Sequence, residues 1–474
     1  MTEAEAEADG IRSRDLAQKL AALRRIIAEK EAAGRPCPGA GPATVPAPGS
    51  AGPSVRQPHS RPIQRPAVRP IETCLPGEVR QTAEGRFFLH ERAFPLEHQH
   101  GRRPLAGALT FRPEEGGRLS PGGTDLGFDP VHAVFLDTET TGLATTSGTL
   151  AFLIGTGFFS GSTFVVRQYF VPDFADEEAC LRALREDLGR FDAVVTFNGR
   201  SFDLPLLEAR YITSRLRPPL AGATHLDLLP ACRRLFRQRI GGCRLAELEN
   251  AVLGFYREDD IPGELIPQMY FDYLRSGDAA PLAGVFEHNR HDILAMAALL
   301  AEVQAVVQGC RRGEGHPIDL FSLACADERE GRLEDSRALY ERALALELPP
   351  AQDLVARKRL SLLYKRMGLH DHAADLWRQM CDQSTCLSLF PFIELAKDLE
   401  HRHRDPAAAR QVVLAALSRS RALDQVFSPN TVTSADLEKR LRRLERKAGV
   451  SPAPAPAPAL SPAPPPALSS ETRR

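Results

Sequence analysis

An acidic pair closes a short apolar run in this chain. The run spans residues 131–136, and Asp137 and Glu139 follow it directly. Side chains two positions apart in a β-strand point to the same side, so the two carboxylates are expected to project together. They repel each other unless a cation lies between them, and Mg²⁺ or Mn²⁺ prefers such oxygen ligands. An isolated pair of this kind is more often a charged strand end or a turn, so the interpretation depends on acids elsewhere.

A third acid follows a second apolar run. Residues 193–197 end at Asn198 and Gly199, which form a turn signal, and an apolar helical pattern begins just beyond. Ser201 is the expected N-cap of this helix, which places Asp203 in its first turn. A carboxylate at this position also complements the helix dipole without any further role.

The fourth acid lies in a helix predicted over residues 286–300, where apolar residues recur at helical spacing. His288 and Asp292 are four residues apart and therefore share one face of this helix. His291 points about 100° away from Asp292. The pair is also compatible with an ordinary solvated helix face.

The order of the expected strands indicates an α/β fold. After the strand that ends at Asp137, residues 150–159 and 164–171 form a predicted hairpin around a Ser-Gly turn. Helices and strands then alternate. Three antiparallel strands followed by two parallel ones predict a mixed five-stranded sheet flanked by helices. The Gly-Thr-Gly at residues 155–157 is not a dinucleotide fingerprint, because a strand follows it where a helix is required.

Taken together, the three acidic elements resemble the motifs of the DEDD (DnaQ-like) superfamily of 3′→5′ exonucleases, which have a ribonuclease-H-like fold. The residues similar to its first, second and third motifs are 136–143, 198–203 and 288–292. Longer strings similar to the bacterial YprB-type branch occur at residues 167–170, 196–207, 225–229 and 259–263. The resemblance covers residues 75 to 308. Better-known branches carry a Tyr four residues before the last Asp, or a His five before it, whereas here His288 occupies the Tyr spacing.

The resemblance implies metal-dependent hydrolysis of phosphodiester bonds in DNA or RNA. Two divalent cations, Mg²⁺ or Mn²⁺, would activate a bound water and stabilise the leaving oxygen. His288 would be the general base, with His291 as the alternative. A phenylalanine placed like Phe202, next to Asp203, more commonly packs in the core than contacts a substrate. The implied metal ligands are Asp137, Glu139, Asp203 and Asp292, and the implied substrate contacts are Asn198, Phe202 and Thr138.

The charge balance excludes a globally basic nucleic-acid-binding protein. The formal net charge is −1 and the pI is near 6.9, so basic character must be local. Residues 233–239 form one basic run, which would guide a phosphate backbone or simply form a solvated helix face. The nine cysteines include no Cys-x-x-Cys pair, which favours reduced thiols and argues against a zinc site. We recognise no signal peptide and no long apolar segment, so a cytoplasmic location without membrane contact is expected.

Shifts in composition divide the chain into six segments. Two of them are rich in Pro and Ala and are expected to be disordered. In another, helical anchors at residues 336–343, 373–380 and 409–416 recur 37 and 36 residues apart. This spacing resembles tetratricopeptide repeats and implies a protein partner. The expected segments are an amphipathic helix at 1–34, a disordered linker at 35–72, a small β-rich preamble at 73–130, a ribonuclease-H-like exonuclease domain at 131–310, an all-α tetratricopeptide-like helical domain at 316–447 and a disordered tail at 448–474.

Several functions are compatible with this organisation. An active 3′→5′ exonuclease is the leading hypothesis, because all four acids are present. The loss of one acid would be the simplest way for such a protein to lose metal-dependent activity. A catalytically silent nucleic-acid-binding protein and a structure-selective endonuclease remain alternatives on the same fold. In a further alternative, the helical repeats make the protein mainly a scaffold.

Overall fold

The structure is a computed structural model that describes residues 68–114, 119, 128–142, 148–383, 388–424 and 431–449. The amphipathic helix expected at 1–34 lies outside the described residues. The same holds for residues 35–67 of the expected linker and for residues 450–474 of the expected tail.

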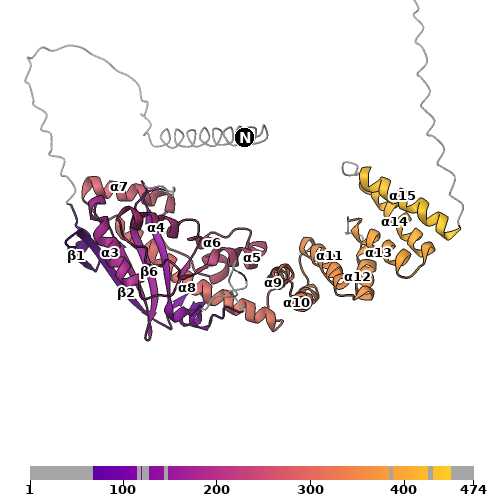
Figure 1. Cartoon of the computed structure of the whole chain (residues 1–474), viewed down its shortest axis with the longest axis horizontal. Helices are drawn as coiled ribbons and strands as arrows, with labels where there is room; N and C mark the ends of the chain where they lie inside the picture. The colour runs from indigo at the N-terminus through magenta and orange to yellow at the C-terminus, as the bar shows by residue number, and fades with distance from the viewer. Residues whose placement is uncertain are drawn as a thin grey trace, which may run out of the picture. The chain divides into compact units, whose positions relative to one another are not determined.

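A mixed seven-stranded sheet forms the centre of the N-terminal half, in the order β1-β2-β7-β6-β5-β8-β9 (Figure 1). The first five strands in this order, from β1 through β2, β7 and β6 to β5, pair antiparallel. Strands β8 and β9 continue the sheet parallel to β5. Three antiparallel strands followed by two parallel ones were expected, and this part of the fold is confirmed. These five strands are β5 (Ala133–Thr140), β6 (Ala151–Ser160), β7 (Thr163–Phe170), β8 (Ala193–Thr196) and β9 (Thr224–Asp227).

Two further strands, β1 (Glu78–Thr82) and β2 (Gly85–Pro95), extend the sheet, so the expected total of five is wrong. They were assigned to a separate preamble, yet β2 pairs with β7 along eight residues. Without β2, the outer edge of β7 would leave its backbone N–H and C=O groups unpaired. Residues 78–95 of the expected preamble therefore belong to the central sheet.

The folded region also begins earlier than the sequence indicated. Arg69, placed in the expected linker, donates two hydrogen bonds to Asp278, of 2.9 and 2.7 Å. Ile71, the first residue of helix α2 (Ile71–Cys74), is buried in the core. Beyond β2, the hairpin β3 (Gln99–His100) and β4 (Arg103–Pro104) leads into the short helix η1 (Leu105–Thr110), which packs on helix α8.

Helices cover both faces of the sheet and explain its apolar strands. Side chains of β5 alternate between two cores: Val134 and Leu136 pack in one, and Phe135 packs in the other. A strand buried on both faces has a nearly continuous apolar sequence. The first core includes helices α3 (Glu177–Leu188), α4 (Asp203–Thr213) and α7 (Ile266–Ser276), and the second includes α5 (Leu228–Ile240) and most of α8 (Leu282–Arg311).

Helix α8 is long and apolar enough to cross a membrane by length and composition alone. An 18-residue window within it has a mean hydropathy of 1.7, so the expectation of no long apolar segment is wrong for this helix. However, 78% of that window is buried inside the protein, which is typical of a core helix. Its apolar character follows from packing between the sheet, η1 and α5.

After residue 316 the described chain is all helical, as expected. Successive helices pack against each other, and Gly331 and Gly368 adopt φ of +77° at two of the turns between them. The fifth residue of each of the three recurring anchors, Tyr340, Trp377 or Val413, is buried. The tetratricopeptide assignment stays a prediction. The helices are α9 (Pro317–Arg329), α10 (Leu333–Ala345), α11 (Pro350–Arg366), α12 (His370–Asp382), α13 (Phe390–His401), α14 (Pro406–Asp424) and α15 (Thr431–Ala448).

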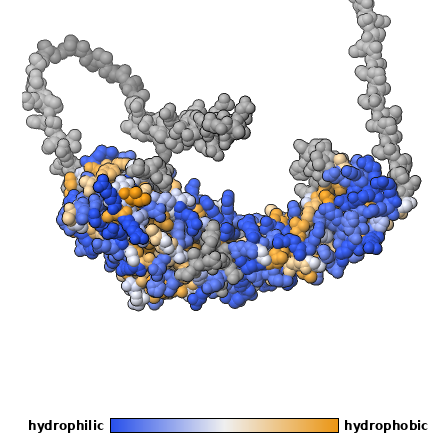
Figure 2. Space-filling model, viewed as in Figure 1, coloured by the Kyte–Doolittle hydropathy of each residue, from blue (hydrophilic) through white to orange (hydrophobic). Residues whose placement is uncertain are grey.

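The outer surface of the last helix is hydrophilic in Figure 2, in agreement with its exposed basic residues. At the other end of the region, α9 packs on α5, and both contribute to one continuous apolar core. The helical region is therefore joined to the sheet domain by packing and not only by the chain.

Candidate active site

The four predicted acids come from three elements that meet at one end of the sheet. Asp137 and Glu139 lie on the last half of β5, whose apolar first half anchors the strand in the core. Asp203 is the first residue of α4, and Asp292 lies on α8. The helix begins one residue later than an N-cap at Ser201 would give, so that capping prediction is wrong, although Asp203 does lie in the first turn.

Hydrogen bonds from neighbouring side chains fix the orientation of two of these acids. Thr138 Oγ1 donates to Asp203 Oδ1 at 2.6 Å, and the substrate contact expected of Thr138 stays a prediction. Asn289 Nδ2 donates to Asp137 Oδ2 at 2.8 Å. Gln168, on β7, donates in turn to Asn289 Oδ1 at 2.8 Å. Neither Asn289 nor Gln168 is exposed to solvent, so Asp137 is held by a buried polar relay.

A glycine makes room for this relay. Gly155 on β6 pairs with Asp137 across the sheet. A Cβ at this position would lie 2.2 Å from Asn289 Oδ1. Any side chain at Gly155 would thus push Asn289 away from Asp137.

The acids carry more negative charge than their surroundings compensate. Burial, followed by the charges of Asp292, Asp203 and Glu139, raises the pKa of Asp137 well above its ordinary value. Burial and the charges of Asp292 and Asp203 do the same to the pKa of Glu139. Burial raises the pKa of Asp203 to about 6, even though the hydrogen bond from Thr138 opposes the change. Mutual repulsion of this kind is relieved by a bound cation, so the residues present fit a metal ion.

His288, and not His291, joins this group. Ligand atoms of Glu139, His288 and Asp292 all lie within 4.8 Å of one another. His291 turns instead to Glu287 at 3.0 Å and to the ring of Phe255, and burial lowers the pKa of His291 to about 4. The helical spacing of the sequence therefore separated the two histidines correctly.

Sequence reasoning missed two residues in the loop between helices η5 (Glu249–Leu253) and η6 (Gly263–Leu265). Asp260 Oδ1 lies 2.7 Å from His288 Nδ1, and Arg257 Nη2 donates to Asp292 Oδ1 at 2.5 Å. Arg257 also lies 3.4 Å from Asp260, which closes a ring of four polar side chains in contact. The signal available was the string at residues 259–263, which includes Asp260 and begins two residues after Arg257.

Behind Arg257 lies a fully buried pair that supports it. Glu249 Oε2 accepts from Arg257 Nε at 2.7 Å, and Glu249 Oε1 lies 2.8 Å from His100 Nε2. Burial raises the pKa of Glu249 to about 8 and lowers the pKa of His100 to about 3. His100 also stacks on Phe255, with ring centroids 4.0 Å apart.

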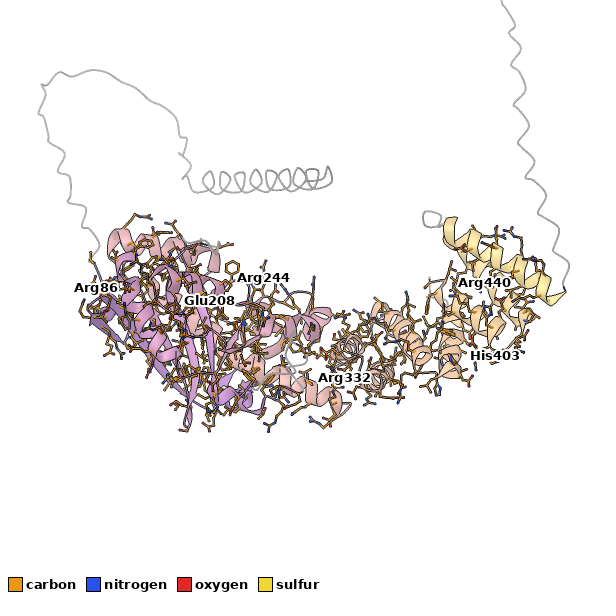
Figure 3. The ribbon with its side chains drawn as sticks, in the orientation of Figure 1. Arg86, Glu208, Arg244, Arg332, His403 and Arg440 are labelled. Carbon is orange, nitrogen blue, oxygen red and sulfur yellow. The ribbon has the colours of Figure 1, made fainter. Side chains whose placement is uncertain are left out.

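A cavity of about 700 Å³ opens from the acids along helix α5. Asp137 and Asp292 lie at one end, and the basic lining comes from Arg233, Arg237 and Arg244. Arg244 immediately precedes the short helix α6 (Leu245–Leu248) and is labelled in Figure 3. The cavity thus has an acidic end and a basic side.

Helix periodicity divides the basic run at residues 233–239. Arg233 and Arg237 are four residues apart, are exposed and face the cavity. Arg234 instead donates to the Leu119 carbonyl at 2.6 Å, and Arg239 pairs with Asp319 of α9 at 3.3 Å. One half of the run faces the candidate site, and the other half has a structural role.

The turn before α4 places the remaining predicted contacts. Asn198 lines the cavity with a φ of +68°, and its N–H donates to Asp227 Oδ1 at 2.8 Å. Asp227 also caps α5 by accepting from Leu229 N. Phe202 is 36% exposed, so the core-packing role considered for it is wrong. Phe202 is adjacent to Asp203 in the chain but is not part of the cavity lining.

Comparisons with known proteins found similarities to one family, one curated protein and one solved structure. The profile of the RNase_H superfamily matches residues 134–304. The uncharacterized protein YprB of Bacillus subtilis (strain 168) is 29% identical over 366 residues, covering 76% of this chain and 86% of that protein. The family B DNA polymerase of the hyperthermophilic archaeon Pyrobaculum calidifontis aligns with a TM-score of 0.32 and 17% identity, over 46% of this chain and 30% of the polymerase chain. The stretch of the chain that is similar to the RNase_H superfamily therefore contains all four acids.

Proposed function

We propose that this protein is a metal-dependent nuclease that removes nucleotides from the 3′ end of DNA or RNA. The observation that carries the proposal is the convergence of four carboxylates from β5, α4 and α8 at one end of a partly basic cavity. The similarity to the RNase_H superfamily supports nuclease-type hydrolysis. The direction of cleavage is inferred from the resemblance of the three motifs to 3′→5′ exonucleases.

The acids would hold two divalent cations, Mg²⁺ or Mn²⁺. Asp137, Glu139, Asp203 and Asp292 would hold them. A bound divalent ion lowers the pKa of a water ligand and neutralises charge on the phosphodiester. The chain's own contribution is orientation, because Thr138 and Asn289 fix two of the carboxylates.

A nucleic acid fits the charge of the cavity. Arg233, Arg237 and Arg244 line its side and would pair with backbone phosphates, while the acids at its end repel them until cations are bound. The same distribution would draw the end of a strand toward the acids. A protein of net charge −1 needs such a local basic surface to bind a polyanion.

The test uses purified full-length protein with Mg²⁺ or Mn²⁺ and single- and double-stranded DNA and RNA. Strands labelled at the 5′ end should shorten one nucleotide at a time, and the Asp203→Ala variant should leave them intact. A circular single strand should be resistant. Cleavage of the circle would favour a structure-selective endonuclease, and binding without any cleavage would favour a catalytically silent nucleic-acid-binding protein.

A further inference from the structure

We propose that His288 binds a divalent cation directly through Nε2, together with Glu139 and Asp292, and that Asp260 is the residue that positions it. The proposal rests on the proposed function and adds a nitrogen to the expected all-oxygen ligand set. It concerns the histidine that occupies the Tyr spacing of the third motif.

The first argument is the grouping of ligand atoms. Atoms of Glu139, His288 and Asp292 lie within 4.8 Å of one another. With metal–ligand bonds of about 2.0–2.2 Å, two atoms bound to one ion lie no more than about 4.4 Å apart. Shifts of a few tenths of an ångström would therefore suffice to bring all three atoms to one ion.

The second argument is the tautomer of His288. Asp260 Oδ1 lies 2.7 Å from Nδ1, and a carboxylate only accepts hydrogen bonds, so Nδ1 carries the proton. Nε2 then presents a lone pair. It lies 3.6 Å from Asp292 Oδ2, too far for a hydrogen bond. A cation between the two groups would be bound by both His288 Nε2 and Asp292 Oδ2.

The third argument is how the neighbouring acid is held. Arg257 binds Asp292 through Oδ1, which leaves Oδ2 on the side of His288. Arg257 also lies 3.4 Å from Asp260, so one guanidinium supports both the ligand and the residue that orients the histidine. Carboxylate–histidine–metal arrangements of this type fix the tautomer and ring orientation of the ligand.

The ligand set has a consequence for the choice of metal. Carboxylate and water ligands suit both Mg²⁺ and Mn²⁺, whereas imidazole nitrogen suits later first-row ions such as Fe²⁺, Ni²⁺ or Zn²⁺ and is a poor ligand for the hard Mg²⁺ ion. We therefore expect the full-length protein to bind Mn²⁺ more tightly than Mg²⁺ in the absence of nucleic acid.

The test measures Mn²⁺ binding and its pulsed electron paramagnetic resonance spectrum, using full-length protein labelled with ¹⁵N-histidine and no nucleic acid. Wild-type protein should show ¹⁵N hyperfine coupling, and His288→Gln should lose it while His291→Gln keeps it. Asp260→Asn should weaken Mn²⁺ binding by about 10- to 100-fold, as expected for a lost partner of a metal-bound histidine. The exposed neighbour Asp259, changed to Asn, is the matched control and should bind as wild type does.

Mn²⁺ bound without nitrogen coupling would overturn the ligand role of His288 and leave the proposed function standing. The same conclusion would follow if His288→Gln bound Mn²⁺ with unchanged affinity. If wild-type protein bound no divalent ion at all, the proposed function itself would fail. The two failures are therefore distinguishable.

Discussion

At the scale of single residues, Asp137 is the most constrained of the four acids. It accepts from Asn289 and lies close enough to Asp292, Asp203 and Glu139 for their charges to raise its pKa. Asn at position 137 would keep the hydrogen bond and remove the charge. This substitution therefore tests directly whether repulsion between the carboxylates destabilises the metal-free protein.

We expect Asp137→Asn to abolish nuclease activity and to raise the metal-free free energy of unfolding, because it removes one of the buried charges that repel one another. Stabilisation by Mn²⁺, measured as an increase in Tm, should disappear because only binding to the native state raises apparent stability. Glu186→Gln, an exposed acid on α3, is the control and should keep both activity and the Mn²⁺ effect. An unchanged Mn²⁺ effect in Asp137→Asn would remove Asp137 from the metal site.

The burial of His100 is expected to make the stability of the protein depend on pH. Its pKa falls from an ordinary value of 6.5 to about 3 in the folded protein, chiefly through burial. Below pH 6.5 the unfolded chain therefore binds a proton at His100 that the native protein does not bind. The stability that neutral His100 contributes is fully present above pH 6.5 and is lost as the pH falls toward 3.

Between pH 7 and pH 5, the wild-type protein should lose about 2 kcal/mol more stability than His100→Gln, since each unit below 6.5 is worth about 1.4 kcal/mol. Urea denaturation at the two pH values measures the difference. Glu249 has a raised pKa and contributes with the opposite sign, but it is present in both proteins. Equal losses in the two proteins would mean that His100 is protonated in the native state.

At the scale of elements, the approach of β6 to α8 determines the position of Asn289. Gly155→Ala would place a Cβ 2.2 Å from Asn289 Oδ1. We expect a loss of about 1–3 kcal/mol in stability, as for other overpacked core positions, together with weaker Mn²⁺ binding as Asn289 leaves Asp137. Gly309→Ala on α8 meets no atom within 4 Å and should be neutral or stabilising by up to about 1 kcal/mol. Wild-type Mn²⁺ affinity in Gly155→Ala would contradict the role of the Asn289 relay.

The exposed face of α5 makes a second prediction at this scale. Changing Arg233 and Arg237 to Ala should weaken binding of single-stranded DNA and reduce the slope of log affinity against log salt by about 1.4, or 0.7 for each lost phosphate contact. Fluorescence anisotropy with the inactive Asp203→Ala background measures this without cleavage. Arg217→Ala, exposed and outside the cavity lining, is the control. An unchanged slope would show that the cavity is not the path of the strand.

At the scale of the whole molecule, the sheet domain and the helical region share a buried ion pair. Asp319 on α9 is almost fully buried, and burial raises its pKa to about 6. Its partner is Arg239 on α5, at 3.3 Å. Removing one partner of a buried pair leaves the other charge uncompensated.

Arg239→Ala should therefore lower the stability of the protein by about 3 kcal/mol at pH 7, measured by urea denaturation. The exposed Arg237→Ala, two residues away on the same helix, should change it by less than about 0.5 kcal/mol. The destabilisation should be smaller at pH 5, where Asp319 is protonated. If both variants unfold at the same urea concentration, the contact between α5 and α9 contributes nothing to stability.

Local periodicity determined much of the fold and of the candidate site. The spacing of two in β5 placed Asp137 and Glu139 together, and the spacing of 3.6 in α8 put His288 with Asp292 and turned His291 away. These features depend on residues a few positions apart, so the sequence contains them directly. The resemblance of three motifs to those of 3′→5′ exonucleases predicted that the strand and the two helices bring the four acids together.

Only the tertiary structure decided the surroundings of the acids. The pairing of β2 with β7, the support of Asn289 by Gln168 and the pairing of Arg239 with Asp319 join residues that lie about 70 to 120 positions apart. Arg257 and Asp260 come from a loop whose charges have no periodicity to reveal their direction. Their positions follow from how helices and strands pack, and packing depends on the whole chain and not on any local pattern.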